Sequence, residues 1–209
     1  LFAALAVLVS FSARLFVSSL DYARDVFGRL EIPAWARPAV GGFGVGVVAL
    51  AWIELVNPSL GLPERGIGIL GTGYGAAQGA INDGAWIPAG WYGVFVLAAL
   101  ALVKMVATAL TLGSGGSGGD LGPSLAVGAL VGGAFGKAAQ LAISPAVDPG
   151  AFALVGMGTF YGGIAHVPLS SFVMVCELAG NYDLLAPLML SEGIAFLLLR
   201  RVTLYSSQP

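Results

Sequence analysis

Residues 113–123 read GSGGSGGDLGP and lie between two long apolar segments. Five of the first seven residues are glycine, and each glycine costs about 1 kcal/mol relative to alanine in a helix interior. A continuous helix therefore cannot run through this stretch. The flanking segments 91–112 and 124–143 carry Lys104 and Lys137 as their only charges, so both are predicted to lie in a membrane. Non-helical backbone at membrane depth is tolerated only where protein buries it or where it lines a watery cavity.

A glycine run that then opens a helix leaves free backbone N–H groups at the positive end of the helix dipole, which suits an anion. A P-loop is excluded because the run has no lysine and follows no strand, and a dinucleotide fingerprint lacks its βαβ context. Close helix packing through small residues explains Gly128, Gly132 and Gly136, which recur every four residues. It does not explain a loop that ends in a helix with Pro123 in its first turn.

The composition is that of a polytopic α-helical membrane protein: 57% of the residues are hydrophobic, 10% are charged, and the mean hydropathy is +0.90. The net charge of −2 and the absence of a basic patch give no sign of nucleic-acid binding. The single Cys176 rules out an intrachain disulfide and a multi-cysteine metal site, and the single His166 cannot form a metal cluster alone. We expect no metal and no cofactor.

Hydropathy and breaker residues predict about eight helical segments, at 1–20 with an amphipathic continuation to 31, and at 38–55, 66–81, 91–112, 121–143, 149–161, 168–178 and 184–199. Loops are expected at 57–65 and 82–90. Several segments are too short to cross a bilayer, so we expect broken, tilted or re-entrant helices. Arginines flank the first turn and follow the last segment, which places both on the cytoplasmic side. The chain starts at Leu1 without a signal peptide, so we expect a fragment of a longer protein.

Residues 113–136 resemble the second anion-binding loop of the CLC family of chloride channels and transporters, whose pattern is Gly-x-Phe-x-Pro opening a helix. Here Gly119 to Pro123 meet the pattern, with Leu121 in place of Phe. Residues 156–190 look like the next block of that family, and Thr203–Ser206 is similar to the start of its last helix. The three blocks occur in family order and cover roughly residues 90–209.

The resemblance implies a CLC-type fold that is one half of an inverted-repeat architecture. Residues 1–209 would be the C-terminal part of the transmembrane domain, and the N-terminal half would be absent. The family transports chloride or similar small anions, as a voltage-gated-type channel or as a proton-coupled exchanger, in a membrane that here would be a bacterial plasma membrane. The alternative is a secondary transporter of fluoride, nitrate or an organic carboxylate with a helix N-terminus binding site. An enzyme is not expected, because one His and one Cys in separate helices give no nucleophile–base pair.

The resemblance also implies the site. The backbone N–H groups of Asp120, Leu121 and Gly122 would face a dehydrated halide, and Tyr205 would donate its hydroxyl. The loop and helix start would be formed by Gly118, Gly119 and Pro123. Backbone donors and a neutral hydroxyl bind an anion without trapping it as a full positive charge would.

The carboxylate of Asp120 stands where the resemblance leads us to expect an apolar residue. One interpretation is a helix-start carboxylate stabilised by the dipole, by typically about 0.3–1 kcal/mol. The other is a carboxylate that competes with the anion and tunes its occupancy. Both remain open at the level of sequence.

For most of the other polar residues the sequence favours structural roles. Glu177 could be a proton-relay acid but is assigned a structural role, and His166 is assigned as a satisfied polar residue at a helix start. Tyr182 falls in a turn between helices, and Glu192 suggests either a relay or a subunit contact. Lys104 and Arg14 are expected to snorkel or pair. A homodimer contact is expected through residues 166–199, with apolar faces that include Phe172, Val173, Leu188, Ile194 and Leu198.

Overall fold

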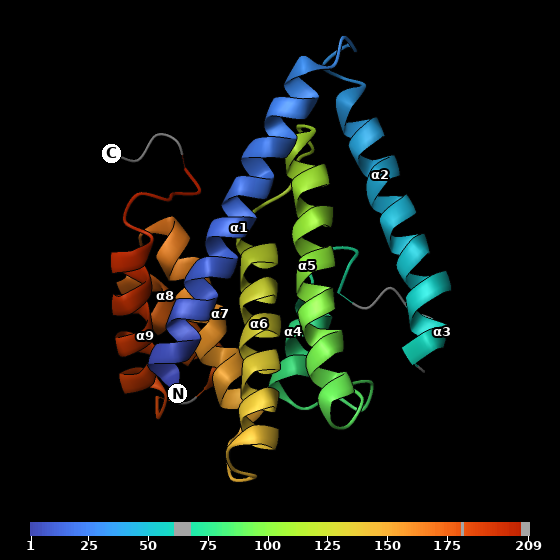
Figure 1. Ribbon diagram of the computed structural model, residues 1–209. Helices are drawn as coiled ribbons and strands as arrows, with labels where there is room; N and C mark the ends of the chain where they lie inside the picture. The colour runs from blue at the N-terminus through green and yellow to red at the C-terminus, as the bar shows by residue number, and fades with distance from the viewer. Residues whose placement is uncertain (61–67, 181, 206–209) are drawn as a thin grey trace.

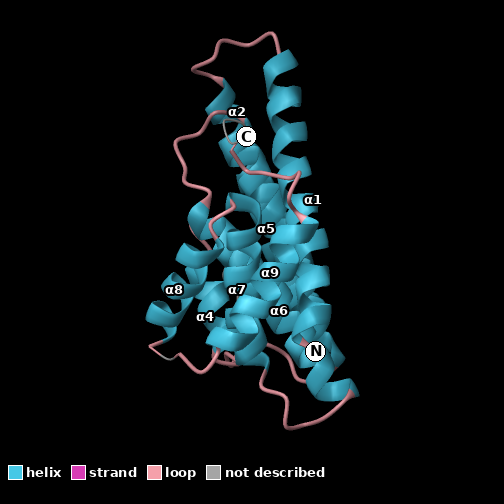
Figure 2. Ribbon diagram, turned by 90° about the vertical axis from the view of Figure 1, so that its left-hand side faces the viewer, coloured by secondary structure: helices cyan, strands magenta, loops and turns pink. Residues whose placement is uncertain are grey.

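The computed structural model describes residues 1–60, 68–180 and 182–205, and within these ranges the chain forms helices and no strand. The elements are α1 Phe2–Arg29, α2 Arg37–Ala51, the π-helix η1 Trp52–Val56, α3 Asn57–Leu60, α4 Tyr74–Ile81, α5 Trp91–Gly113, α6 Leu121–Ala142, α7 Pro149–Ala165, α8 Pro168–Ala179 and α9 Leu185–Leu198. Figure 1 shows their arrangement, and Figure 2 shows the same bundle turned by 90°. The predicted all-α fold is confirmed.

Three of these helices, α1, α5 and α6, are long and apolar enough by length and composition to cross a membrane. The helix α5 has 23 residues, which at 1.5 Å per residue gives roughly 35 Å. The helix α6 begins partway along α5 and not at its end, so the loop that joins them runs back beside the bundle (Figure 1). The start of α6 therefore lies within the length spanned by α5, as expected for a broken helix.

The helix α7 forms the centre of the packing, in contact with α1, α4, α6, α8 and α9. Aromatic pairs join it to α1: Phe16 and Phe160 meet edge to face with ring centroids 5.6 Å apart, and Phe2 stacks on Phe152 at 4.6 Å. Such pairs add about 0.5–1.5 kcal/mol each beyond the burial of their area. The most buried helix of the bundle thus connects the two halves of the sequence.

The seam between α6 and α7 is made by the predicted glycine stripe. A Cβ at Gly132 would lie 2.2 Å from the Phe152 carbonyl oxygen, and a Cβ at Gly128 would lie 2.6 Å from that of Gly156. At Gly136 a Cβ would lie 2.8 Å from the Phe152 side chain. Only residues without a side chain allow the two backbones to approach this closely. The packing role predicted for these glycines is confirmed.

Three predicted boundaries are wrong. The helix predicted at 149–161 runs to Ala165, because Gly162 and Gly163 do not end it but pack against Ser171 and Leu199. The helix predicted at 66–81 begins at Tyr74, after turns through glycines 68, 71 and 73 at positive φ; residues 66 and 67 lie outside the described residues.

The loop predicted at 57–65 begins with a helical turn, α3, and its remainder from residue 61 lies outside the described part of the chain. The π-helix η1 immediately precedes α3. Pro58 follows this widened turn, and a proline has no N–H to donate to the preceding turn of a helix.

Candidate anion-binding site

The glycine run reverses the chain direction at the end of α5. The Gly116 N–H donates to the Thr111 carbonyl at 3.0 Å, and the Ser114 hydroxyl donates to the same carbonyl at 3.0 Å, so both cap the last turn. Gly115 follows at φ +86°, a left-handed conformation that L side chains rarely adopt. This turn sends residues 116–120 back toward the start of α6.

The first turn of α6 keeps its backbone donors free. The Asp120 carbonyl accepts from both the N–H and the hydroxyl of Ser124, at 3.0 and 2.6 Å, which fixes the helix start. Among the described residues, the backbone N–H groups of residues 119–122 meet no hydrogen-bond acceptor. These are the donors that a helix N-terminus cannot satisfy internally, so they are available to a ligand.

The Asp120 side chain does not cap its own helix. Instead, its Oδ1 accepts a hydrogen bond from the Tyr205 hydroxyl at 3.2 Å, across 85 positions of the sequence. The structure thus brings the predicted helix start and the predicted tyrosine together. It also shows that the Asp120 carboxylate, for which the sequence allowed two interpretations, is hydrogen-bonded to the Tyr205 hydroxyl.

Backbone contacts position Tyr205. The Leu204 N–H donates to the Ile164 carbonyl near the end of α7 at 3.0 Å, and the Tyr205 N–H donates to the Thr203 hydroxyl oxygen at 3.2 Å. Leu204 is buried. Burial first, and then the charge of Asp120, raise the pKa of the Tyr205 hydroxyl, so the group stays a protonated donor.

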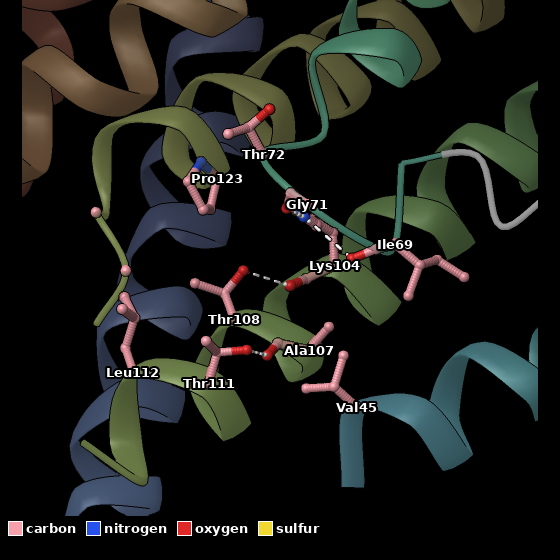
Figure 3. A pocket seen from close by; sticks show the side chains of 12 residues that line it. Val45, Ile69, Gly71, Thr72, Lys104, Ala107, Thr108, Thr111, Leu112 and Pro123 are labelled. Carbon is pink, nitrogen blue, oxygen red and sulfur yellow. Dashed lines mark hydrogen bonds between the residues drawn. The ribbon is translucent and has the colours of Figure 1, made fainter. Parts of the chain in front are cut away.

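A cavity of about 270 Å³ lies on another side of the glycine run. Figure 3 shows it between α5, α2 and the turn before α4. Its lining includes Gly118, Gly119 and Pro123, and also Thr72, Thr108 and Lys104. The predicted loop residues therefore border this cavity, while Asp120 meets Tyr205.

Lys104 neither snorkels nor pairs with an acid among the described residues, so that expectation is wrong. Its side chain is buried, and its ammonium donates to the carbonyls of Ile69 and Gly71, at 3.1 and 2.6 Å (Figure 3). A buried positive charge in a medium of low dielectric constant favours anions nearby. Sequence reasoning missed this contribution, although the lone charge within an otherwise apolar span was the available signal.

Glu192 forms a second buried polar cluster, away from the glycine run. Its Oε1 accepts from the Ser171 hydroxyl at 2.6 Å, while its Oε2 has no partner among the described residues. Gly158 and Gly162 make room, since a Cβ at Gly162 would lie 2.3 Å from the Ser171 oxygen. Glu192 thus faces α7 and α8 of its own chain, which does not fit the subunit contact considered from the sequence.

The remaining candidates lie outside the glycine run. Glu177 is exposed and accepts a hydrogen bond from the Tyr182 hydroxyl. His166 does not begin a helix: it ends α7 at φ 57°, and its Nε2 lies 3.2 Å from the Leu199 carbonyl oxygen. Leu188, expected on a dimer face, is fully buried against α7. Leu121 is 37% exposed, and Gly122 is buried, with Thr72 nearest to its Cβ position.

Residues 1–200 match the family model described as "Voltage gated chloride channel". The chain is 37% identical over 187 residues to chloride channel protein CLC-f of Arabidopsis thaliana, covering 86% of this chain and 22% of that protein. It is 36% identical over 119 residues to the H(+)/Cl(-) exchange transporter ClcA of Vibrio campbellii, covering 56% of this chain and 25% of the relative. A putative ClcB-like chloride channel protein of Ralstonia nicotianae is 34% identical over 179 residues, covering 85% of this chain and 37% of that protein.

Among solved structures, a slow cyanobacterial Cl⁻/H⁺ antiporter superimposes with a TM-score of 0.70 at 22% sequence identity. The match covers 96% of this chain and 43% of the antiporter chain, and it shows that the fold is shared. The chain therefore spans between about a fifth and two fifths of the length of these relatives.

Proposed function

Because this chain belongs to the voltage-gated chloride channel family, we propose that it carries one side of an anion site in a protein that moves chloride or a similar small anion across a membrane. The protein works as a channel or as a proton-coupled exchanger, without a cofactor and without catalysing a chemical reaction. The anion is the substrate.

One observation carries this proposal: the start of α6 has free backbone N–H groups, and the Asp120 side chain at that start accepts a hydrogen bond from the hydroxyl of Tyr205, near the C-terminal end of the chain. A dehydrated anion at membrane depth is costly unless hydrogen bonds replace its water. The N–H groups of Leu121 and Gly122 and the hydroxyl of Tyr205 supply such bonds without a fixed positive charge in contact. Binding of this kind is favourable and still weak enough for release.

The names of the relatives support chloride as the ion, since two are called chloride channel proteins and one is called an H(+)/Cl(-) exchange transporter. The chain spans less than two fifths of the length of these relatives. In this proposal, another part of the same protein supplies the remaining side of the site.

The proposed location is a bacterial plasma membrane with the C-terminal end in the cytoplasm. The turn between α1 and α2, which Arg29 and Arg37 flank, lies toward the same end of the bundle as residues 199–205 (Figures 1 and 2). Homodimers form through α8 and α9, whose outer faces expose Leu169, Val173, Leu197 and Leu198 either to lipid or to a second subunit. Chemical cross-linking in the membrane measures this association.

The test is anion flux from liposomes that contain the purified full-length protein. Chloride efflux into chloride-free buffer is followed with an electrode, and pH is recorded inside the vesicles. We expect efflux from the wild-type protein and about fivefold weaker apparent chloride affinity in Tyr205→Phe, because one hydrogen bond of about 1 kcal/mol is lost. The double variant Tyr205→Phe, Leu121→Trp should lose efflux.

The matched control is Tyr182→Phe, since Tyr182 also donates to a carboxylate but lies away from the glycine run. It should transport as the wild type does. Proton movement driven by a chloride gradient identifies an exchanger, and its absence identifies a channel. Absence of halide flux from the full-length wild-type protein would disprove the proposed function.

A further inference from the structure

Within the described part of the chain, two aspartates are the N-cap residues of helices, and their side chains behave differently. Asp148 precedes α7 and caps it, with its Oδ1 accepting from the Gly150 N–H at 2.9 Å. Asp120 precedes α6 and makes no such bond. Its carboxylate points to the Tyr205 hydroxyl instead, at 3.2 Å. Helix capping therefore accounts for one aspartate and leaves the other to be explained.

The bond from Tyr205 to Asp120 uses the donor that the proposed anion site needs. A tyrosine hydroxyl has a single hydrogen, so it can donate fully to one acceptor at a time. A carboxylate that holds this hydrogen bond and an anion that needs it exclude each other. The negative charge of Asp120 also opposes a second negative charge beside it.

Resting on the proposed function, we propose that Asp120 determines the occupancy of the anion site: its carboxylate holds the Tyr205 hydroxyl while the site is empty and must release it when an anion binds. The aspartate acts as an internal competitor. The apparent affinity for the anion is lowered by the fraction of molecules in which the hydroxyl is already taken.

The tyrosine is well placed for this exchange. Its main chain is tied to the end of α7 through Leu204 and Ile164, so the hydroxyl cannot follow the carboxylate far. The Asp120 carbonyl is held by Ser124, so the main chain at the helix start is also fixed. Release therefore requires a rotation of the Asp120 side chain and leaves both main chains in place.

The experiment measures chloride binding to the purified full-length protein by isothermal titration calorimetry with potassium chloride. The variants are Asp120→Asn, Asp120→Ser, Tyr205→Phe and the double variant Asp120→Asn, Tyr205→Phe. Asp120→Asn keeps the side-chain shape, and serine is a favoured residue at helix starts, so at least one of the two should fold. Glu177→Gln is the control, because that carboxylate also accepts from a tyrosine and lies elsewhere.

We expect Asp120→Asn and Asp120→Ser to bind chloride about three- to tenfold more tightly than the wild type. In the Tyr205→Phe background the gain from Asp120→Asn should shrink, since the Tyr205 hydroxyl is no longer there to be released. Glu177→Gln should match the wild type.

Unchanged or weaker chloride binding in both Asp120 variants overturns the inference, and so does an equal gain in both tyrosine backgrounds, which would show a charge effect that does not involve the hydroxyl. Absence of chloride binding in the wild type and every variant overturns the proposed function instead. The two failures are therefore distinguishable.

Discussion

Glycine has opposite uses in the loop before α6 and in the seam along α6. In the loop, a Cβ at Gly115 or Gly119 would meet nothing within 4 Å. In the seam, a Cβ at Gly128 or Gly132 would lie 2.6 or 2.2 Å from a backbone oxygen of α7. In the loop, Gly119 leaves its own N–H and those of the helix start uncovered, whereas the seam glycines bring two backbones together.

The two uses of glycine predict that substitutions in the seam mainly change stability and that substitutions at the helix start mainly change binding, within a stretch of about 25 residues. Seam positions hold α6 against α7, the most buried helix, so substitution there acts on folding. Gly119 in the loop borders the proposed anion site, so substitution there is expected to act on the anion. Three substitutions test this separation, in decreasing order of their expected effect on the free energy of unfolding.

The largest effect is expected for Gly132→Leu. The new side chain must displace the Phe152 carbonyl, and overpacking of this kind costs about 3 kcal/mol or more where backbone has to move. We expect little monodisperse protein on size-exclusion chromatography in detergent. Gly42→Leu on α2 is the control, because a Cβ there meets nothing within 4 Å. Normal yield of Gly132→Leu would show that the seam is looser than described.

An intermediate effect is expected for Gly115→Ala. Alanine at φ +86° has open space but an unfavourable main chain, which costs about 1–2 kcal/mol. The midpoint of thermal unfolding should fall, and Gly115→Asn should restore part of the loss because asparagine tolerates the left-handed region better. Equal loss in both variants would point to a contact of the side chain and not to the main chain.

The smallest change in stability is expected for Gly119→Ala. Its Cβ meets open space at an ordinary φ, so the free energy of unfolding should stay within about 0.5 kcal/mol of the wild type. Chloride binding should nevertheless weaken, since the methyl group stands next to the N–H of Asp120. A variant with lowered stability and unchanged chloride affinity would reverse the roles assigned to the two regions.

The sequence was sufficient for features that depend on local chemistry. Glycine and proline predicted where α5 ends and α6 begins, and the four-residue spacing predicted the seam. The family resemblance predicted that the segments of Asp120 and Tyr205 lie close together. It did not predict that the Asp120 carboxylate points to the Tyr205 hydroxyl. That direction depends on a residue 85 positions away.

Features that depend on which apolar face packs inward could not be predicted. Leu188 was expected on an outer face and is fully buried, because lipid and protein interior are equally apolar and hydropathy does not distinguish them. The end of α7 was misplaced for a related reason: Gly162 and Gly163 serve packing against α8 and α9, and a pair of glycines alone does not reveal that. The acceptors of Lys104 are backbone carbonyls, which have no sequence signature.

The position of Lys104 has a consequence for the order in which the protein is assembled. A lone lysine at the centre of a helix costs about 2.5–3.5 kcal/mol on insertion into a bilayer, and here its acceptors are carbonyls of Ile69 and Gly71. Those residues leave the ribosome before α5 does, whereas α4, with eight residues, is too short to cross a bilayer by itself. Insertion of α5 and entry of the preceding turn are thus mutually dependent, and the two segments are expected to enter the membrane as one unit.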